Sequence, residues 1–211
     1  EAVEPEPSVV VLAVKPQMMD EVLAPCAGYD GALFISIAAG KSLGYFEEGL
    51  GGDKAIVRTM PNTPSAVGEG MTVCVANTAC TADDRDLATA LMQAAGEVDW
   101  LEDESLMDAV TGVSGSGPAY LFHFVEALAE AGVAQGLPAA QAQRLARQTV
   151  IGAAKLLQES GEAPGTLREN VTSPGGTTAE ALKVLRESGA LVELMTKAVA
   201  ASAKRSKDLS D

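Results

Sequence analysis

The sequence predicts an α/β unit with a parallel sheet in residues 1–102, followed by an all-helical unit in residues 103–211. Two patterns predict this order. Before residue 102, short runs of apolar and β-branched residues alternate with helical stretches, as in parallel strands covered on both faces. After it, apolar residues recur at spacings of three and four, and no strand is expected.

Five strands are expected in the first half. The runs that predict them are SVVVLAV (8–14), ALFISIA (32–38), KAIVRTM (54–60), MTVCVAN (71–77) and GEVDWLE (96–102). Helices are expected between strands at 17–24, 42–49 and 81–95. Because a strand, a helix and a second strand form a right-handed crossover, the first three strands should be parallel, and the last two should extend the same sheet.

The second half should consist of helices separated by Gly and Pro. The expected helices cover 104–112, 118–135, 138–159 and 177–207. Pro118 and Pro138 stand where a first helical turn begins, and Gly136 stands where a helix ends. The apolar faces of these Ala- and Gly-rich helices look too broad for one subunit to cover. This pattern favours oligomerisation through the second half, with a monomeric bundle as the alternative.

Composition excludes several classes of partner. The formal charge of −14 argues against nucleic acid, because phosphate backbones require clustered Lys and Arg. Three cysteines without a C-x-x-C spacing suit free thiols in a reducing, cytoplasmic compartment. With His123 as the one histidine, no zinc constellation is expected, and His123 itself is expected to be a half-buried core residue. No apolar run approaches the roughly 18–20 residues that span a bilayer.

Small or polar residues follow each of the first three expected strands. The segments are AVKP (13–16), AAGKS (38–42) and MPNTP (60–64). Each one alone fits a plain turn from strand to helix. Together they favour a binding crevice, because ligands gather at the carboxyl ends of parallel strands. Lys15, Ser42 and Asn62 supply the polar groups there, and Lys15 suits a phosphate.

The stretch NVTSPGGTTAEAL (170–182) sets hydroxyls and two glycines directly before an expected helix. Gly175 and Gly176 carry no Cβ, so the backbone can approach a ligand closely. The first amides of a helix have no partner within it, and they attract a negative group. This stretch therefore predicts either a site for a small anion or a simple cap between two helices.

Two further segments have less specific interpretations. TGVSGSGPAY (111–120) lacks the Lys-Ser/Thr pair of a phosphate loop, so it is interpreted as a domain junction and helix start, with Ser116 lining a cleft. The acidic run 102–104 is interpreted as a solvated helix start. No Ser-His-Asp set, carboxylate pair or metal cluster is recognisable. Hydride transfer from a nicotinamide fits, since the cofactor then carries the reactivity.

These residues resemble the pyrroline-5-carboxylate reductase family over essentially the whole chain. The segments that carry the resemblance are LAVKP (12–16), AAG (38–40), MPNTP (60–64), DAVTGVSGSGPAY (108–120) and SPGGTT (173–178). The last two are specific at this order and separation. The resemblance implies reduction of 1-pyrroline-5-carboxylate to L-proline by NADPH or NADH, the last step of proline biosynthesis. It also implies a Rossmann domain and a helical dimerisation domain whose dimers can assemble into rings.

The resemblance assigns roles to residues. Thr178 would reach the ring nitrogen of the substrate as the catalytic residue. The substrate-binding set would be Asn170, Val171, Ser173, Gly175, Gly176 and Thr177. The cofactor-binding set would be Ala13, Val14, Lys15, Pro16, Ala38, Ala39, Gly40 and Asn62. The loop at 173–178 could serve a nicotinamide on its own chain or on the partner, and the sequence leaves both open.

One departure from the family concerns the first strand. The family begins with a strand and a G-x-G-x-x-G turn, and neither is present; GLGGDKA (49–55) has the wrong order of elements. The run at 9–14 has no polar alternation, so we expect an interior strand, the fourth of a Rossmann sheet, with a neighbour in a missing N-terminal half. On this view the 211 residues are not a complete reductase.

Two other functions remain possible from the sequence. Another imine reductase or a β-hydroxyacid reductase has a similar build, but the latter needs a lysine in the helical domain as proton donor. Lys155 is the one lysine in the helices before residue 177. The other alternative is a non-catalytic, dimerising remnant.

Overall fold

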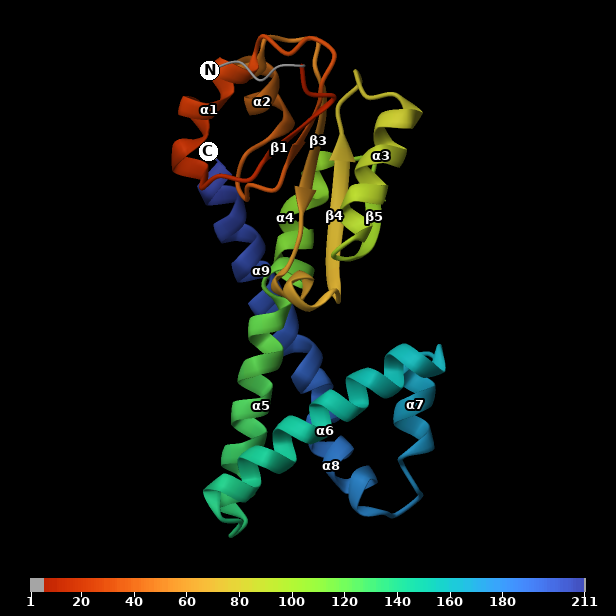
Figure 1. Ribbon diagram of the computed structural model, residues 1–211. Coiled ribbons are helices and arrows are strands. Elements are labelled where there is room, and N and C mark those ends of the chain that lie inside the picture. Colours follow the sequence, from red (N-terminus) through yellow and green to blue (C-terminus); the bar gives the residue numbers. More distant parts are fainter. Residues whose placement is uncertain (1–5, 211) are drawn as a thin grey trace. The chain divides into compact units, whose positions relative to one another are not determined.

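A computed structural model describes residues 6–210, which fall into two compact units (Figure 1). The sheet unit comprises Glu1–Pro118 together with Ala198–Asp211, and the helical unit comprises Ala119–Lys197. These limits differ from the predicted division after residue 102, because the sheet unit keeps the segment up to Pro118 and regains the end of the chain. Residues 1–5 of the predicted first domain lie outside the described part.

All five predicted strands form, with ends shifted by a few residues. They are β1 (Val9–Leu12), β2 (Leu33–Ser36), β3 (Ala55–Met60), β4 (Gly70–Ala76) and β5 (Gly96–Leu101). The helices of the sheet unit are α1 (Met19–Cys26), α2 (Leu43–Leu50), α3 (Ala82–Gln93) and the short α4 (Met107–Val110). Short 3-10 turns lie at Pro16–Met18, Thr63–Val67 and Glu104–Leu106, and a π-helical turn lies at Thr111–Gly115.

The sheet follows chain order, β1-β2-β3-β4-β5, but it is not parallel throughout. The pairs β1–β2, β2–β3 and β4–β5 are parallel, whereas β3 and β4 are antiparallel. The last two strands extend the same sheet, as predicted, but the antiparallel pairing of β3 with β4 makes the sheet mostly rather than wholly parallel. The reason is the connection at 61–69, which holds a 3-10 turn and is too short for the dozen or so residues of a parallel crossover.

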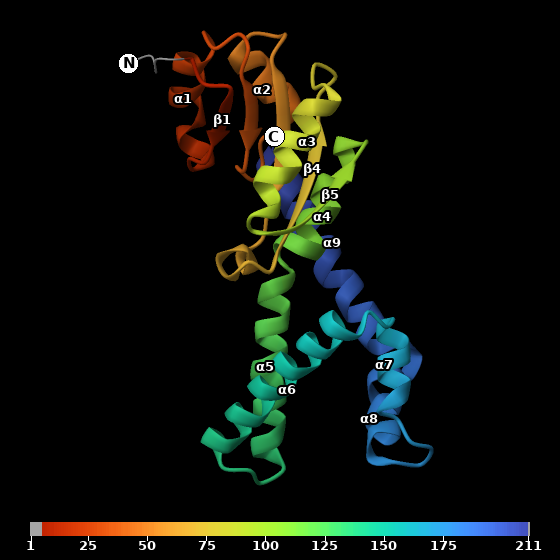
Figure 2. The same cartoon turned by 45° about the vertical axis from the view of Figure 1, so that its right-hand side comes forward.

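Apolar side chains cover both faces of the sheet. On one face, α1, α2 and α4 contribute to a cluster that includes Leu12, Met19, Phe34, Phe46 and Met107. On the other face, Leu33, Ile35, Val57 and Cys74 pack with Ala88 of α3. Figures 1 and 2 show α1 and α2 beside β1 to β3, and α3 beside β4 and β5. Burial on both faces explains the apolar run of β2, in which all four residues are buried.

β1 forms one edge of the sheet. Within residues 6–210 it pairs with β2 alone, and Val11 is 49% exposed. The neighbour expected on its other side is not among these residues.

Glu104 joins three parts of the sheet unit. Its Oε1 accepts hydrogen bonds from Nη1 of Arg58 in β3 at 2.6 Å and from the backbone amide of Leu43, which begins α2, at 2.8 Å. The Arg58 side chain is 9% exposed and that of Glu104 is 29% exposed. The interpretation of 102–104 as a solvated run is thus wrong for Glu104, which pairs with a buried cation and caps a helix end.

Asn77 fastens the end of β4 to β3. Its Oδ1 accepts from the amide of Ile56 at 3.1 Å, and its Nδ2 donates to the carbonyl of Lys54 at 2.9 Å and to Oε1 of Glu47 at 3.0 Å. Asn77 is buried, so no water molecule is available to replace its hydrogen bonds to these backbone groups.

The helical unit contains more helices than the sequence predicts. They are α5 (Gly117–Ala134), α6 (Ala139–Ser160), α7 (Pro164–Asn170), α8 (Thr177–Arg186) and α9 (Ala190–Ser210), whose final turns belong to the sheet unit. The prediction omits α7. The helix predicted at 177–207 is broken at Glu187–Gly189, where Ser188 adopts φ 51°. The helix predicted at 104–112 is a 3-10 turn, α4 and the beginning of the π-helical turn.

Many large apolar side chains of the helical unit are exposed. Its buried apolar residues, within the described chain, are Ala129, Ala142 and Ala146. Phe122 is 64% exposed and Val192 is 72% exposed. The predicted breadth of the apolar faces is therefore confirmed. The expectation of a core histidine is wrong, because the side chain of His123 is 83% exposed and lies 3.0 Å from Glu126.

The three cysteines are free, and burial raises the pKa of the Cys74 thiol to about 12. Over residues 6–210, no helix has the length and apolarity needed to cross a membrane. The same residues contain no group of three His, Cys, Asp or Glu side chains arranged to hold a metal ion.

Replacing Asn77 should weaken the sheet unit. In Asn77→Ala the buried amide of Ile56 and carbonyl of Lys54 lose their partner, so we expect the free energy of unfolding to fall by about 1–3 kcal/mol. Urea unfolding followed by fluorescence of Trp100, the single tryptophan, reports on this unit. Gln141→Ala, an exposed change on α6, is the control and should stay within about 0.5 kcal/mol. Equal midpoints for the two variants would contradict the role of Asn77.

Candidate functional site

The carboxyl ends of β1 and β2 bring two predicted segments to one edge of the sheet. The strands pair up to Leu12 and Ser36, and the amide of Ile37 donates to the carbonyl of Leu12 at 3.2 Å. Segments 13–16 and 38–40 therefore leave the sheet side by side. Ala13, Lys15 and Ala39 are exposed, whereas Ala38 is buried and its amide donates to Oγ of Ser36.

A pocket of about 400 Å³ opens beside this edge, within the sheet unit. We call it the serine pocket. Its lining residues are Pro16, Gln17, Ala39, Gly40, Thr111, Ser116, Ser202, Arg205, Ser206 and Leu209. It thus joins the two segments at the sheet edge to the π-helical turn and to the end of α9.

Part of this lining was predicted. Pro16, Ala39 and Gly40 belong to the expected cofactor set, and Ser116 was expected to line a cleft. The contribution of α9 was not predicted. Ser202 and Ser206 lie four residues apart, so they share one helix face, and this spacing is the one signal in the sequence that indicates them.

Ser42 and Asn62 are occupied by structural hydrogen bonds. Oγ of Ser42 accepts from the amide of Tyr45 at 3.1 Å, so Ser42 caps α2. Oδ1 of Asn62 accepts from the amide of Met71 at 2.9 Å, and its Nδ2 donates to the carbonyl and to Oγ of Ser114 at 3.2 and 3.3 Å. Asn62 therefore ties the end of β3 to β4 and to the π-helical turn.

The exposed edge at 13–16 and 38–40 fits part of a nucleotide cofactor. Small alanine side chains leave the backbone accessible, and Lys15 presents a cation that forms no ion pair with any described residue. A free ammonium at the carboxyl end of a parallel strand suits a phosphate group. Val14 is half-buried against the core of the unit, which anchors the segment.

The loop before α8 belongs to the helical unit. Gly176 is the N-cap of α8 and has no side chain to bond the first amides, so those of Thr177 and Thr178 lack a partner within the helix. Oγ of Ser173 lies 2.5 Å from the position that a Cβ on Gly176 would take. Gly175 turns the chain with φ 68°. A hydroxyl and helix-end amides are thus gathered at one point.

The other residues of the predicted substrate set are more dispersed. Asn170 ends α7 and its Nδ2 donates to Oε2 of Glu162 at 3.2 Å. Val171 is 62% exposed. Thr178 is half-buried on the first turn of α8.

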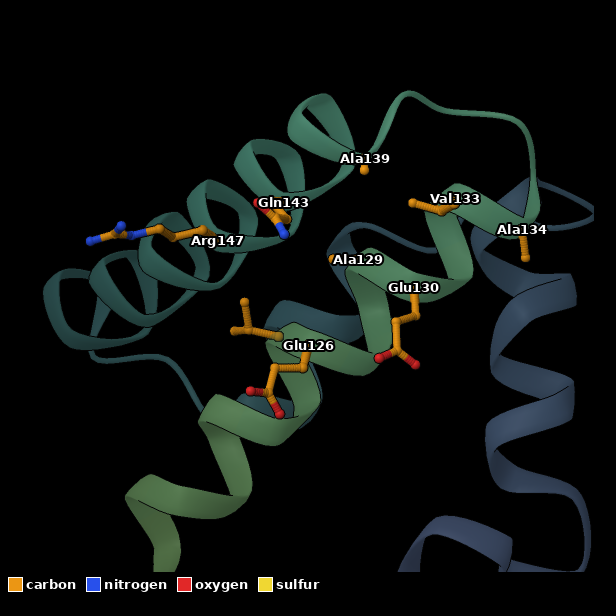
Figure 3. A pocket seen from close by; sticks show the side chains of 9 residues that line it. Glu126, Ala129, Glu130, Val133, Ala134, Ala139, Gln143 and Arg147 are labelled. Atoms are coloured by element: carbon orange, nitrogen blue, oxygen red, sulfur yellow. The ribbon is translucent and has the colours of Figure 1, made fainter.

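A larger hollow of about 770 Å³ lies between α5 and α6, and none of the predicted site residues lines it. Figure 3 shows Glu126 and Glu130 on α5, with Gln143 and Arg147 on α6. Val125, Ala129 and Val133 supply apolar surface. This hollow is part of the uncovered apolar face of the helical unit.

Comparison with known proteins covers both units. A family model described as "Pyrroline-5-carboxylate reductase dimerisation" matches residues 104–209. The chain is 50% identical over 205 residues to a pyrroline-5-carboxylate reductase of Synechocystis, with 95% of this chain and 74% of the relative aligned. It is 44% identical over 204 residues to that of Escherichia coli, with 94% and 76% aligned.

Solved structures agree with these matches. A pyrroline-5-carboxylate reductase from Coxiella burnetii superposes with a TM-score of 0.91 at 44% identity, covering 97% of this chain and 76% of that one. The enzyme from Plasmodium falciparum, solved with NADP bound, gives 0.81 at 34% identity, covering 97% and 78%.

The fold and these matches define an NAD(P)-dependent oxidoreductase with a helical dimerisation region. More narrowly, the chain belongs to the pyrroline-5-carboxylate reductase family, as its motifs predicted.

Lys15 provides a direct test of the sheet edge as a nucleotide site. We expect Lys15→Ala to raise the Kd for NADPH about two- to fivefold at low salt, because one exposed charge contact is lost. High salt screens such contacts, so the difference should shrink there. The readout is NADPH fluorescence on titration. The control Lys155→Ala removes an exposed cation of the helical unit and should leave the Kd unchanged; an equal Kd for parent and Lys15→Ala at low salt would rule out the charge contact.

Proposed function

We propose that the chain reduces 1-pyrroline-5-carboxylate to L-proline with NADPH or NADH, the last step of proline biosynthesis. The observation that carries this proposal is the SPGGTT loop, in which the Ser173 hydroxyl lies over the start of α8 in a chain of this family. A loop of this build binds a small anion, and the substrate carries one carboxylate.

The nucleotide is assigned to the sheet edge. When bound, a nicotinamide nucleotide supplies the hydride. The chain would hold it with the segments 13–16 and 38–40, where Lys15 faces a phosphate. In this assignment Asn62 acts indirectly, because its amide is bonded to Met71 and Ser114. The serine pocket adjoins the same edge and brings Pro16, Ala39 and Gly40 together.

The substrate carboxylate is assigned to the loop before α8. The hydroxyl of Ser173 and the amides of Gly175 and Thr177 donate to it, while Asn170 and Val171 border the site. The predicted donor at Gly176 is occupied, because its amide donates to the carbonyl of Ser173 at 3.0 Å and closes the loop. Hydrogen bonds to a charged group contribute roughly 1.5–3 kcal/mol each, which is enough to fix a substrate of this size. The partial positive charge of a helix N-terminus adds to this attraction.

Thr178 is assigned to the ring nitrogen. When the carbon of the C=N bond accepts a hydride, the electron pair of the π bond moves to nitrogen, and the nitrogen retains or gains a proton. A hydroxyl can orient that nitrogen and relay a proton without being a strong acid. Thr178 stands on the first turn of α8, two residues after the N-cap, so the same helix start holds both ends of the substrate.

The side chain of Lys155 disfavours the β-hydroxyacid alternative. Its Nζ lies 3.3 Å from Oε1 of Glu159, and both side chains are more than half exposed. A lysine that donates a proton during catalysis needs a sheltered position close to the substrate. An exposed i,i+4 ion pair on a helix is instead a typical surface feature.

The proposal includes a homodimer formed through the helical unit, with larger rings built from dimers. The exposed apolar residues of α5 to α9 and the hollow between α5 and α6 support it, because faces of this breadth are normally covered by a partner. A cytoplasmic location is also proposed. Three unpaired cysteines support it, since free thiols suit a reducing compartment.

The reaction is tested by following NADPH oxidation with two kinds of substrate, using the full-length protein that contains this chain. We expect turnover with 1-pyrroline-5-carboxylate and none with open-chain ketones that correspond to β-hydroxyacids. The product should be identified as L-proline by chromatography. Equal or faster oxidation with an open-chain substrate would contradict the proposal, and a chain that binds no NADPH would support a non-catalytic role.

Thr178 is tested by substitution. We expect Thr178→Ala to lower kcat/KM by roughly ten- to a hundredfold, the loss of one hydrogen bond formed in the transition state. Thr178→Ser keeps the hydroxyl and should retain more activity. Thr196→Ala is the control, since among residues 6–210 that hydroxyl bonds to the carbonyl of Val192 in its own helix and to no other group. An alanine variant as fast as the parent would show that Thr178 has no catalytic role and serves only in the first turn of α8.

Oligomerisation is tested with Phe122, whose ring is exposed on α5. Phe122→Glu places a charge on the apolar face, so we expect light scattering to show a smaller particle than the parent. Val67→Glu alters a residue of the sheet unit that is 77% exposed, and it should leave the mass unchanged. A parent that is monomeric at micromolar concentration would refute the proposed dimer.

A further inference from the structure

We propose that the end of α9, residues 198–210, positions the loop at residues 39 and 40 of the sheet edge, with Ser202 and Ser206 as positioning residues for nucleotide binding. This inference deepens the proposed function, and it relies on the assignment of the nucleotide to that edge. All the residues concerned belong to the sheet unit.

The π-helical turn gives α9 room to approach. A Cβ on Gly112 would lie 2.9 Å from the carbonyl oxygen of Val199 and 3.1 Å from its Cγ1. A backbone contact this close is open to glycine alone, because the oxygen of a helix cannot move aside. The first of the two glycines in TGVSG, Gly112, is therefore explained by the passage of α9, which the interpretation as a domain junction did not foresee.

Two side-chain hydrogen bonds then fix the helix along the turn. The hydroxyls of Ser116 and Ser202 lie 2.8 Å apart, and the hydroxyl of Ser206 donates to Oδ1 of Asp108 at 2.7 Å. Ser206 is 8% exposed, so its bond to a carboxylate is shielded from water. Residues 199, 202 and 206 recur at helical spacing, which places these contacts on one face of α9.

The same face ends on the loop at the sheet edge. A Cβ on Gly40 would lie 3.4 Å from the carbonyl oxygen of Leu209, and Gly40 adopts φ 75°. The backbone of the loop is therefore packed against the last turns of α9. Contact at Gly40, two hydrogen bonds and the close approach at Gly112 form one continuous row of interactions. A shift of α9 along this row would change the conformation of the loop.

Neither serine needs to touch the nucleotide for this role. Ser202 and Ser206 line the serine pocket with Ala39 and Gly40, but their hydroxyls bond to Ser116 and Asp108. Their effect on binding passes through the loop. The expected signature is a change in nucleotide affinity together with increased mobility of residues 37–43, while the rest of the sheet stays unchanged.

The experiment compares the parent with Ser202→Ala/Ser206→Ala and with the control Thr196→Ala, whose hydroxyl lies on the same helix outside the sheet unit. Hydrogen exchange should become about three- to tenfold faster in the peptide covering residues 37–43, and remain unchanged in peptides from β2 and β3. The Kd for NADPH should rise by a similar factor, about three- to tenfold, and Thr196→Ala should match the parent in both measurements.

Unchanged exchange at 37–43 in the double variant would overturn the inference. Faster exchange there with an unchanged Kd would also overturn it, because the loop would then not set affinity. If the double variant does not fold, the single Ser202→Ala decides by the same two measurements. A parent chain that binds NADPH but fails to reduce 1-pyrroline-5-carboxylate would refute the proposed function. The positioning role would still be decided, because hydrogen exchange and the Kd for NADPH test it without any turnover.

Discussion

The arrangement of the sheet unit depends on the two hydrogen bonds that the carboxylate of Glu104 accepts. Glu104 follows β5 in the chain, yet it bonds to Arg58 in β3 and to the first amide of α2. An arginine that is 9% exposed requires such a partner, because an unpaired buried cation is strongly unfavourable. A 3-10 turn, α4 and the π-helical turn follow in the chain, so this contact anchors the segment that contributes Thr111 and Ser116 to the serine pocket.

Most of the fold could be predicted from local patterns. Continuous apolar runs located β1 to β3, apolar-rich stretches located β4 and β5, and the spacing of apolar residues located α5 and α6. Strand direction could not be predicted in the same way, because a strand buried on both faces has the same pattern whether it is parallel or antiparallel. The direction could have been inferred from the connection at 61–69, which is too short for a parallel crossover. The seven residues of α7 were too few to show a helical period, and the break at Ser188 depends on a backbone conformation that serine seldom adopts.

The same distinction between local patterns and distant contacts applies to the candidate site. Segments 13–16, 38–40 and 173–178 could be proposed as binding segments from the sequence, because their glycines, prolines and hydroxyls lie within a few residues of each other. The partners of Glu104, Ser202 and Ser206 could not, because their contacts join residues 46, 86 and 98 positions apart. A serine in a helix carries no local sign of a distant carboxylate. Only the folded chain brings such groups together, and for this reason the role of α9 was absent from the sequence-based prediction.

The division of the chain has a consequence for how the protein is made. The helical unit, Ala119–Lys197, is inserted between two pieces of the sheet unit. During translation the first 118 residues leave the ribosome long before Ala198–Asp211, so the sheet forms while Gly112, Ser116 and Asp108 still lack their partners in α9. Closing a loop of this length is slow relative to local folding. The serine pocket is therefore the last feature of the sheet unit to be completed, because a chain that has not yet reached Ala198 lacks the residues that α9 contributes to it.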